Sequence, residues 1–190
     1  MEYRHAVDKL SKILSAKRFQ HSLGVSQTAA DLAVRFGEDE EKARLAGLLH
    51  DCARNISSNN LLQMAKVFAI VVNDVERCQP VLLHAPIGAC LARREYGIDD
   101  PDILKAIAFH TTGGRDLSKL DKIIYLADFI EPSRDFPGID KLRSLALYNL
   151  DAAMLAAYDK SLHYVIEQGE LIHPATVEGR NYLLLQRQTT

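Results

Sequence analysis

A histidine and an aspartate stand side by side, as His50 and Asp51, at the end of the apolar run 45–49. Alanine, leucine and glycine at this density are typical of a helix packed on most of its circumference, so we expect the pair to point into the protein. A buried charge is costly unless it is paired, hydrogen-bonded or bound to a metal. The pair therefore indicates either a His–Asp hydrogen bond that only joins two helices or part of a metal site.

Four other titratable side chains are expected to face inward. His21 lies on the apolar face of a predicted helix, His84 precedes a run of small residues, His110 ends a predicted helix, and Asp128 lies in the most hydrophobic stretch of the chain. Taken singly, each is more simply a core residue that has a local partner. Taken together, imidazoles and carboxylates without thiolates suit iron, manganese or zinc in a functional site and argue against a structural zinc.

Three arginines and a threonine lie one turn or one loop from these residues, where they could contact an anionic substrate. A guanidinium can bind phosphate oxygens through two hydrogen bonds. Each arginine could instead be a solvated surface side chain. The predicted substrate contacts are Arg18, Arg54, Arg134 and Thr111.

The elements that must position these residues are predicted to be helices. Apolar residues recur at helical spacing, and no alternation of apolar and polar residues is long enough for a sheet. Capping residues mark the expected starts, and glycines mark several ends. We expect one helix from Ser15 to Gly37, one from Asp39 to His50, a short one capped by Ser58 or Asn59, one from Asp100 to His110 and one from Ser118 to Ile130. Pro86 is expected to bend or start another helix. A long helix from about Leu142 to Gln168 and a last helix through Leu184 complete the chain.

Size and composition limit the possible classes of protein. A chain of 190 residues is about one domain, and its formal net charge of −2 gives no general basic field for nucleic acids or membrane surfaces. No apolar run reaches the length of a membrane span, and the first residues lack the apolar core of a signal peptide. Three cysteines without C-x-x-C spacing argue against a disulfide framework. We expect an all-α, single-domain protein of the cytoplasm.

The order of the six inward-facing residues resembles the HD-domain superfamily of metal-dependent phosphohydrolases. More narrowly, five blocks resemble its branch of symmetrical bis(5'-nucleosyl)-tetraphosphatases, and the block around Asp128 is the most specific of them. The Gly-Tyr-Pro signature of related cyclic-dinucleotide phosphodiesterases is absent. The five blocks are residues 18–25, 47–54, 84–89, 110–113 and 127–134.

The resemblance implies a helical bundle of the HD-domain type that binds iron and hydrolyses diadenosine tetraphosphate to two ADP molecules. Matched position by position, four residues would bind one metal ion: His21, His50, Asp51 and Asp128. His84 and His110 match positions that bind a second metal ion or grip phosphate. The domain would span residues 1–190, with the metal-site core at about 18–134 and the helices at about 139–187 completing the core.

A bound metal can lower the pKa of a water molecule and act as a Lewis acid on phosphoryl oxygens, which a charged polyphosphate requires. We expect Asp51 to orient the attacking water and Arg54 to stabilise the leaving diphosphate, so these two are the predicted catalytic residues.

Alternative functions are a nucleotidase or phosphodiesterase that acts on a smaller nucleotide, and a nucleotide-binding module without turnover. A nucleic-acid-binding protein would need a helix rich in Arg and Lys, which the sequence lacks. The sequence leaves open whether one or two metal ions bind, which metal and base are preferred, and whether two chains form a homodimer.

Overall fold

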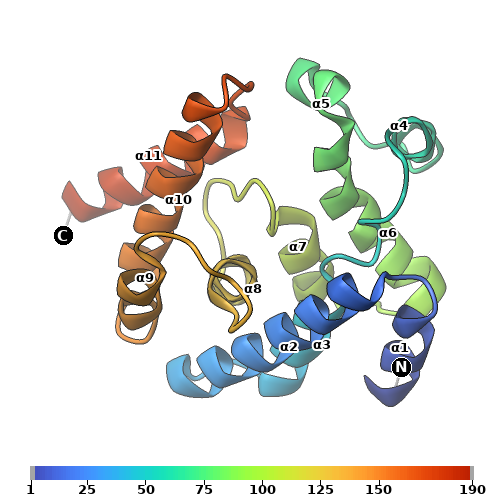
Figure 1. Cartoon of the computed structure of the whole chain (residues 1–190), viewed down its shortest axis with the longest axis horizontal. Coiled ribbons are helices and arrows are strands. Elements are labelled where there is room, and N and C mark those ends of the chain that lie inside the picture. Colours follow the sequence, from blue (N-terminus) through green and yellow to red (C-terminus); the bar gives the residue numbers. More distant parts are fainter. Residues whose placement is uncertain (1–2, 189–190) are drawn as a thin grey trace.

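The computed structural model describes residues 3–188, which form α-helices and one short 3-10 helix, with no strand in that range (Figure 1). The all-α prediction is therefore confirmed. In chain order the elements are α1 (Tyr3–Ser11), α2 (Ala16–Phe36), α3 (Glu40–Leu49), α4 (Ser58–Val67), α5 (Asp74–Cys78), the 3-10 helix η1 (Pro80–Leu83), α6 (His84–Tyr96), α7 (Pro101–Phe109), α8 (Lys119–Ile130), α9 (Ile139–Ala146), α10 (Leu150–Glu167) and α11 (Pro174–Gln188).

Local capping sets the starts of the helices that position the site. The side chains of Ser15, Asp39, Asp100 and Ser118 each accept a hydrogen bond from a backbone N–H in the first turn of the helix that follows. Such a bond satisfies a donor that has no partner inside the helix. At the other end of α2, Gly37 adopts a left-handed conformation with φ +65°. These predicted boundaries are confirmed, and Pro86 lies in the first turn of α6 as expected.

Two predicted boundaries are wrong. A single helix from Leu142 to Gln168 is replaced by α9 and α10, because the Asn149 side chain accepts a hydrogen bond from Ala152 N and so starts a new helix. This cap competes with continuation of the helix, as asparagine commonly does. Near α4, the capping position is Ser57, whose side chain makes no capping bond, and the helix starts at Ser58. The short elements α5 and η1 were not predicted.

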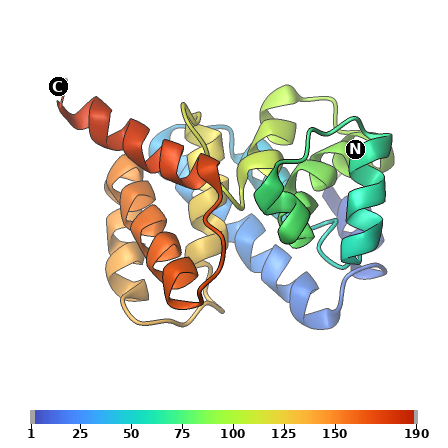
Figure 2. The same ribbon diagram turned by 90° about the horizontal axis from the view of Figure 1, so that it is seen from above.

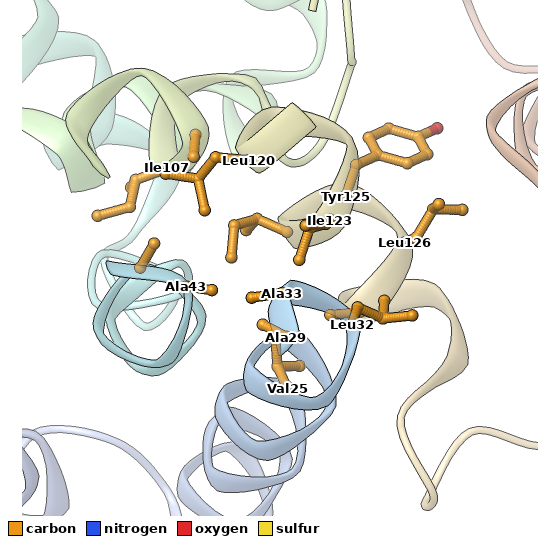
Figure 3. Close-up of a cluster of buried hydrophobic side chains, with 14 of the residues drawn as sticks. Val25, Ala29, Leu32, Ala33, Ala43, Ile107, Leu120, Ile123, Tyr125 and Leu126 are labelled. Carbon is orange, nitrogen blue, oxygen red and sulfur yellow. The ribbon is translucent and has the colours of Figure 1, made fainter. Parts of the chain in front are cut away.

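Helix α2 runs through the main core and packs against α3 and α8. Figure 3 shows Ala29 and Ala33 of α2 facing Ala43 of α3 and Ile123 of α8. These small side chains allow the helix backbones to approach closely. The backbones also approach closely at Gly47, where an added Cβ would lie 3.0 Å from the Ser26 Cα atom. This contact fixes α2 and α3 relative to one another, and both helices carry predicted site residues.

The C-terminal helices α9, α10 and α11 lie on one side of α8, and α4 to α6 lie on the opposite side of the molecule (Figures 1 and 2). Tyr158 joins α10 to the loop that follows α7. Its hydroxyl accepts a hydrogen bond from Gly114 N at 3.1 Å and donates one to Gly114 O at 3.3 Å. In the described chain, none of the helices combines the length and apolar character that a membrane span requires.

Candidate metal and phosphate site

The six inward-facing residues predicted from the sequence meet at one place. His21 lies in the second turn of α2, His50 caps the end of α3, His84 begins α6, and His110 caps the end of α7. The imidazole centroids form a chain, with separations of 5.2 Å, 4.9 Å and 5.0 Å from His21 through His50 and His110 to His84. The two carboxylates, Asp51 and Asp128, lie against this chain of rings.

The carboxylates contact the histidines through the Nε2 atoms. His21 Nε2 lies 3.0 Å from Asp128 Oδ1, and His84 Nε2 lies 3.2 Å from Asp51 Oδ1. His110 Nε2 is 3.7 Å from the same Asp51 oxygen, and His50 Nε2 is 3.6 Å from Asp51 Oδ2. Three groups of three residues place one ligand atom each within 4.8 Å of one another, and together they include all six residues.

Every histidine of the cluster uses its Nδ1 atom for a hydrogen bond directed away from the centre. His50 and His110 each lie 2.7 Å from the carbonyl oxygen three residues earlier, and His84 makes the same contact with Val81. Because a carbonyl only accepts, these three Nδ1 atoms are donors. A neutral ring then has an unprotonated Nε2, so the lone pairs point toward the centre of the cluster.

Those lone pairs lack donors. Within residues 3–188, His21 Nε2 and His50 Nε2 are buried without a hydrogen-bond partner. His84 Nε2 and His110 Nε2 lie 3.2 Å apart, and the Thr111 hydroxyl, within 3.1 Å of both, can donate its single proton to only one of them. A buried polar atom without a partner is costly. Unpaired imidazole nitrogens beside two carboxylates fit a divalent transition metal, which would be bound by these same atoms.

Electrostatics keeps the acidic members of the cluster ionised. Burial acts to raise the pKa of Asp51, but the nearby His50, His110 and His84 hold it far below its usual value. Asp128 behaves in the same way, and its close contact with His21 is the largest of the effects that lower its pKa. Burial lowers the pKa of His50 to about 4, so this imidazole is neutral at pH 7 and its lone pair is available.

His21 differs from the other rings. Burial alone would lower the pKa of its imidazole, but contacts with Asp128 and Glu131 outweigh burial and raise it. A proton can therefore occupy His21 Nε2 when no cation is bound. Metal binding would displace this proton, which is the usual coupling between metal affinity and pH.

The predicted arginines lie around the cluster. Arg18 Nη1 donates to Asp51 Oδ2 at 2.9 Å, and Arg134 donates to the Asp128 carboxylate and, at 2.7 Å, to the Asp128 carbonyl oxygen. Arg54 is half-buried; burial lowers its pKa, and the charges of Asp51 and Asp128 oppose that effect. Arg54 lies in the turns after α3, and its backbone N–H donates a hydrogen bond to Asp51 O at 2.9 Å.

A cleft of about 1020 Å³ opens beside the cluster. Thr111, Asp128 and Arg134 line it on the cluster side. The opposite wall comes from α10 and the loop before α11, and includes Lys160, His163 and His173, which the sequence analysis did not single out. No local pattern distinguishes these three residues from a solvated helix face and loop, so only the tertiary structure identifies them.

Glu131 is a further residue of the site that was not predicted from the sequence. This residue caps the C-terminus of α8, is 1% exposed, and accepts a hydrogen bond from His21 Nδ1 at 3.0 Å. A signal was available, because Glu131 follows Asp128 by three residues and lies inside the stretch 127–134 that carries the family resemblance. An isolated glutamate at a helix end is ordinarily solvated, and burial is visible only in the folded chain.

Comparisons with known proteins agree with this geometry. The family model described as HD domain matches residues 18–133. The symmetrical bis(5'-nucleosyl)-tetraphosphatase of Halalkalibacterium halodurans is 40% identical over 175 residues, which is 92% of this chain and 93% of that protein. The protein of the same name from Bacillus subtilis is 35% identical, with 97% of this chain and 98% of that protein covered.

A solved structure has the same fold over nearly the whole chain. It is the crystal structure of a protein from Clostridium acetobutylicum described as a "predicted HD superfamily hydrolase involved in NAD metabolism". The TM-score is 0.95 with 43% identity, and 98% of each chain is covered. The arrangement of helices, the buried His and Asp cluster and these relatives lead to one assignment: the chain belongs to the HD domain family.

Proposed function

We propose that this protein is a metal-dependent hydrolase that cleaves diadenosine tetraphosphate symmetrically into two ADP molecules. Its relatives of that name match almost the whole chain and are themselves matched over almost their whole length. The resemblance in the sequence blocks around His21, His50 and Asp128 supports the same reaction.

One observation carries the proposal. Four imidazoles turn their Nε2 atoms toward one centre, two of them without a hydrogen-bond partner, and two carboxylates turn ionised oxygens toward it. That centre borders a cleft of about 1020 Å³. Sites for small ligands commonly have volumes of roughly 300–1,000 Å³, so this cleft is at the upper end of the range. A long polyphosphate with two nucleosides suits such a cleft better than a mononucleotide does.

We assign His21, His50, Asp51 and Asp128 as the ligands of one divalent cation, most suitably iron. His84 and His110, with Thr111 beside them, would hold a second cation or a phosphate oxygen. A cation in this set would lower the pKa of an attacking water molecule and polarise a phosphoryl oxygen. Imidazole nitrogens favour iron, manganese or zinc over magnesium.

The chain's own residues would bind and orient the reactants. Asp51 has one oxygen beside Arg18 and the other beside His84, so its carboxylate can hold a water molecule in a fixed direction. Arg18, Arg54 and Arg134 surround the carboxylates and can bind phosphate oxygens and stabilise the charge that develops on the leaving diphosphate. The site residues would come from about 18–134, and the α9 to α11 segment would close the cleft over the substrate.

The test is product analysis with diadenosine tetraphosphate after loading the purified protein with iron(II) or manganese(II). ADP as the only nucleotide product is expected. In ¹⁸O-labelled water, one of the two ADP molecules should gain the label at its β-phosphate. ATP and AMP as products would reject symmetrical cleavage, faster turnover of a mononucleotide would favour a nucleotidase, and binding without turnover would favour a nucleotide-binding module.

A further inference from the structure

His21 is anchored differently from the other three histidines of the cluster. His50, His84 and His110 lie at helix ends and donate from Nδ1 to a carbonyl oxygen three residues earlier in the same chain segment. His21 lies within α2, where backbone carbonyls already accept the helical hydrogen bonds. Its Nδ1 atom therefore needs a partner from another element, and that partner is Glu131 Oε1 at 3.0 Å.

Both carboxylate oxygens of Glu131 are held by donors. Ser133 N donates to Oε2 at 2.8 Å, and the Ser133 hydroxyl donates to Oε1 beside the His21 contact. An amide in place of this carboxylate would present an NH₂ group to one of these donors, so that two donors would face each other. The geometry around Glu131 therefore specifies a carboxylate and not merely a polar side chain of the same shape.

Helix α2 leaves room for this carboxylate at Gly24, one turn after His21. A Cβ atom at position 24 would lie 2.6 Å from Glu131 Oε2 and 3.3 Å from its Cδ atom. The atoms in the way belong to the end of a flexible side chain and not to backbone. An alanine at this position would therefore displace the carboxylate and leave the helix in place.

His21 has a carboxylate at each ring nitrogen, because Asp128 Oδ1 lies 3.0 Å from Nε2, but Asp128 is also paired with Arg134. We propose that Glu131 is a positioning residue that holds His21 in the Nδ1–H form against this competitor, with the Nε2 lone pair directed at the centre of the cluster. The negative charge makes His21 the one strongly electron-donating imidazole of the set, whereas the other three have neutral carbonyl partners. Such outer partners of a metal-binding histidine fix the tautomer and the ring orientation. The inference rests on the metal-binding part of the proposed function and not on the identity of the substrate.

Glu131→Gln is the decisive variant. Ser133 N donates to Glu131 Oε2, so the amide oxygen of the introduced glutamine should take that position. The amide NH₂ group then turns toward His21. His21 would accept this hydrogen bond at Nδ1 and carry its own proton on Nε2. Long-range ¹H–¹⁵N NMR of the metal-free protein, at a pH where the ring is neutral, should show the Nδ1–H form in the original protein and the Nε2–H form in the variant. Manganese(II) affinity should fall by roughly 10–100-fold, the usual effect of losing an outer partner.

Two further variants separate positioning from a general effect on folding. Gly24→Ala should cause the same tautomer change and loss of manganese(II) affinity while circular dichroism shows an unchanged helix content, since alanine favours helix. Ser133→Ala keeps the carboxylate and its charge, so the His21 tautomer should not change.

An Nε2–H form of His21 in the original protein would overturn the inference, and so would an unchanged tautomer and manganese(II) affinity in Glu131→Gln. Absence of diadenosine tetraphosphate hydrolysis by the original protein would reject the proposed function alone, because the tautomer is measured without substrate or metal.

Discussion

The Nε2 atoms of His84 and His110 lie 3.2 Å apart, although both rings donate from Nδ1 to backbone carbonyls. Two neutral imidazoles in this arrangement face each other with lone pairs and gain nothing from the contact. One hydroxyl, that of Thr111, is near enough to donate to one of them. The folded chain thus brings together groups that repel one another unless a cation or a proton lies between them.

Metal binding should therefore stabilise the fold as well as enable hydrolysis. We expect a chelator to inactivate the protein and to lower the thermal unfolding midpoint, and we expect iron(II), but not magnesium, to restore both. At a free metal concentration of about 100 times the dissociation constant, the gain in the free energy of unfolding should be about 2.7 kcal/mol. Scanning calorimetry with and without metal measures it, and an unchanged midpoint would contradict metal binding by the cluster.

Asp51→Ala should abolish both hydrolysis and metal uptake while the helical fold persists. Asp51 contacts His50, His84, His110 and Arg18, so its removal takes away the carboxylate that the three imidazoles would share as co-ligands of a cation. Metal content measured by mass spectrometry and helix content measured by circular dichroism test the two halves of this prediction. Full metal content with no activity would restrict Asp51 to orienting the water.

Arg54→Ala should reduce kcat/KM by an amount that corresponds to roughly 1–3 kcal/mol, as expected for a lost hydrogen bond to a charged group. Arg54 is half-buried near Asp51 and Asp128, and is well placed to reach a bound phosphate. The matched control is Arg77→Ala, since Arg77 lies on α5 with its side chain 64% exposed and is paired with Asp74. Equal values of kcat/KM for both variants would show that Arg54 does not contact the substrate.

The parts of the site that could be predicted from sequence are those with a local signal. His50 and Asp51 follow a dense apolar run, and His110 follows a helix with a clear start at Asp100 and Pro101. Their positions at helix ends could therefore be predicted from the sequence. The inward direction of His21 followed in the same way from the apolar residues of α2.

The remaining parts depend on contacts between distant segments. Glu131 becomes a partner of His21 only when the end of α8 meets α2, and Lys160 becomes part of the cleft only when α10 folds back over the cluster. The break between α9 and α10 does have a local cause, which is the Asn149 cap. The apolar pattern continues across this break, so the pattern alone predicted one continuous helix. Apolar periodicity therefore predicted the helices better than it predicted their interruptions.

In the metal-free protein, the free energy of unfolding should fall as the pH is lowered from about 6.5 toward about 4. Burial lowers the pKa of His50 from 6.5 to about 4, and burial lowers that of His84 as well. The unfolded chain therefore binds more protons in this interval, and stability is lost on acidification. His21, whose pKa is raised, takes up its extra proton above this interval, so its stabilising contribution is largely complete by about pH 6.5 and does not offset the loss below it.

Urea unfolding at a series of pH values measures this dependence. His50→Gln should flatten the profile, because it removes the ring with the pKa of about 4. A profile without slope in the original protein would mean that His50 is not buried as a neutral ring.

Gly47→Ala should destabilise the protein, although alanine is the better helix former by roughly 1 kcal/mol. An added Cβ would lie 3.0 Å from both the Ser26 Cα atom and the Val25 carbonyl oxygen, and these backbone atoms cannot move without separating α2 from α3. Overpacking of this kind typically costs about 1–3 kcal/mol. Because α2 carries His21 and the end of α3 carries His50, the same shift should also weaken metal binding.

Gly88→Ala in α6 is the matched control, since its nearest atoms would be 3.5 Å or more away, at ordinary contact distance. This variant should be neutral or slightly more stable, with unchanged metal affinity, in urea unfolding and manganese(II) titration. If both glycine variants behave alike, helix propensity alone decides stability at these positions. If only Gly47→Ala loses stability and metal affinity together, the close contact between α2 and α3 is what holds two of the proposed ligands at their spacing.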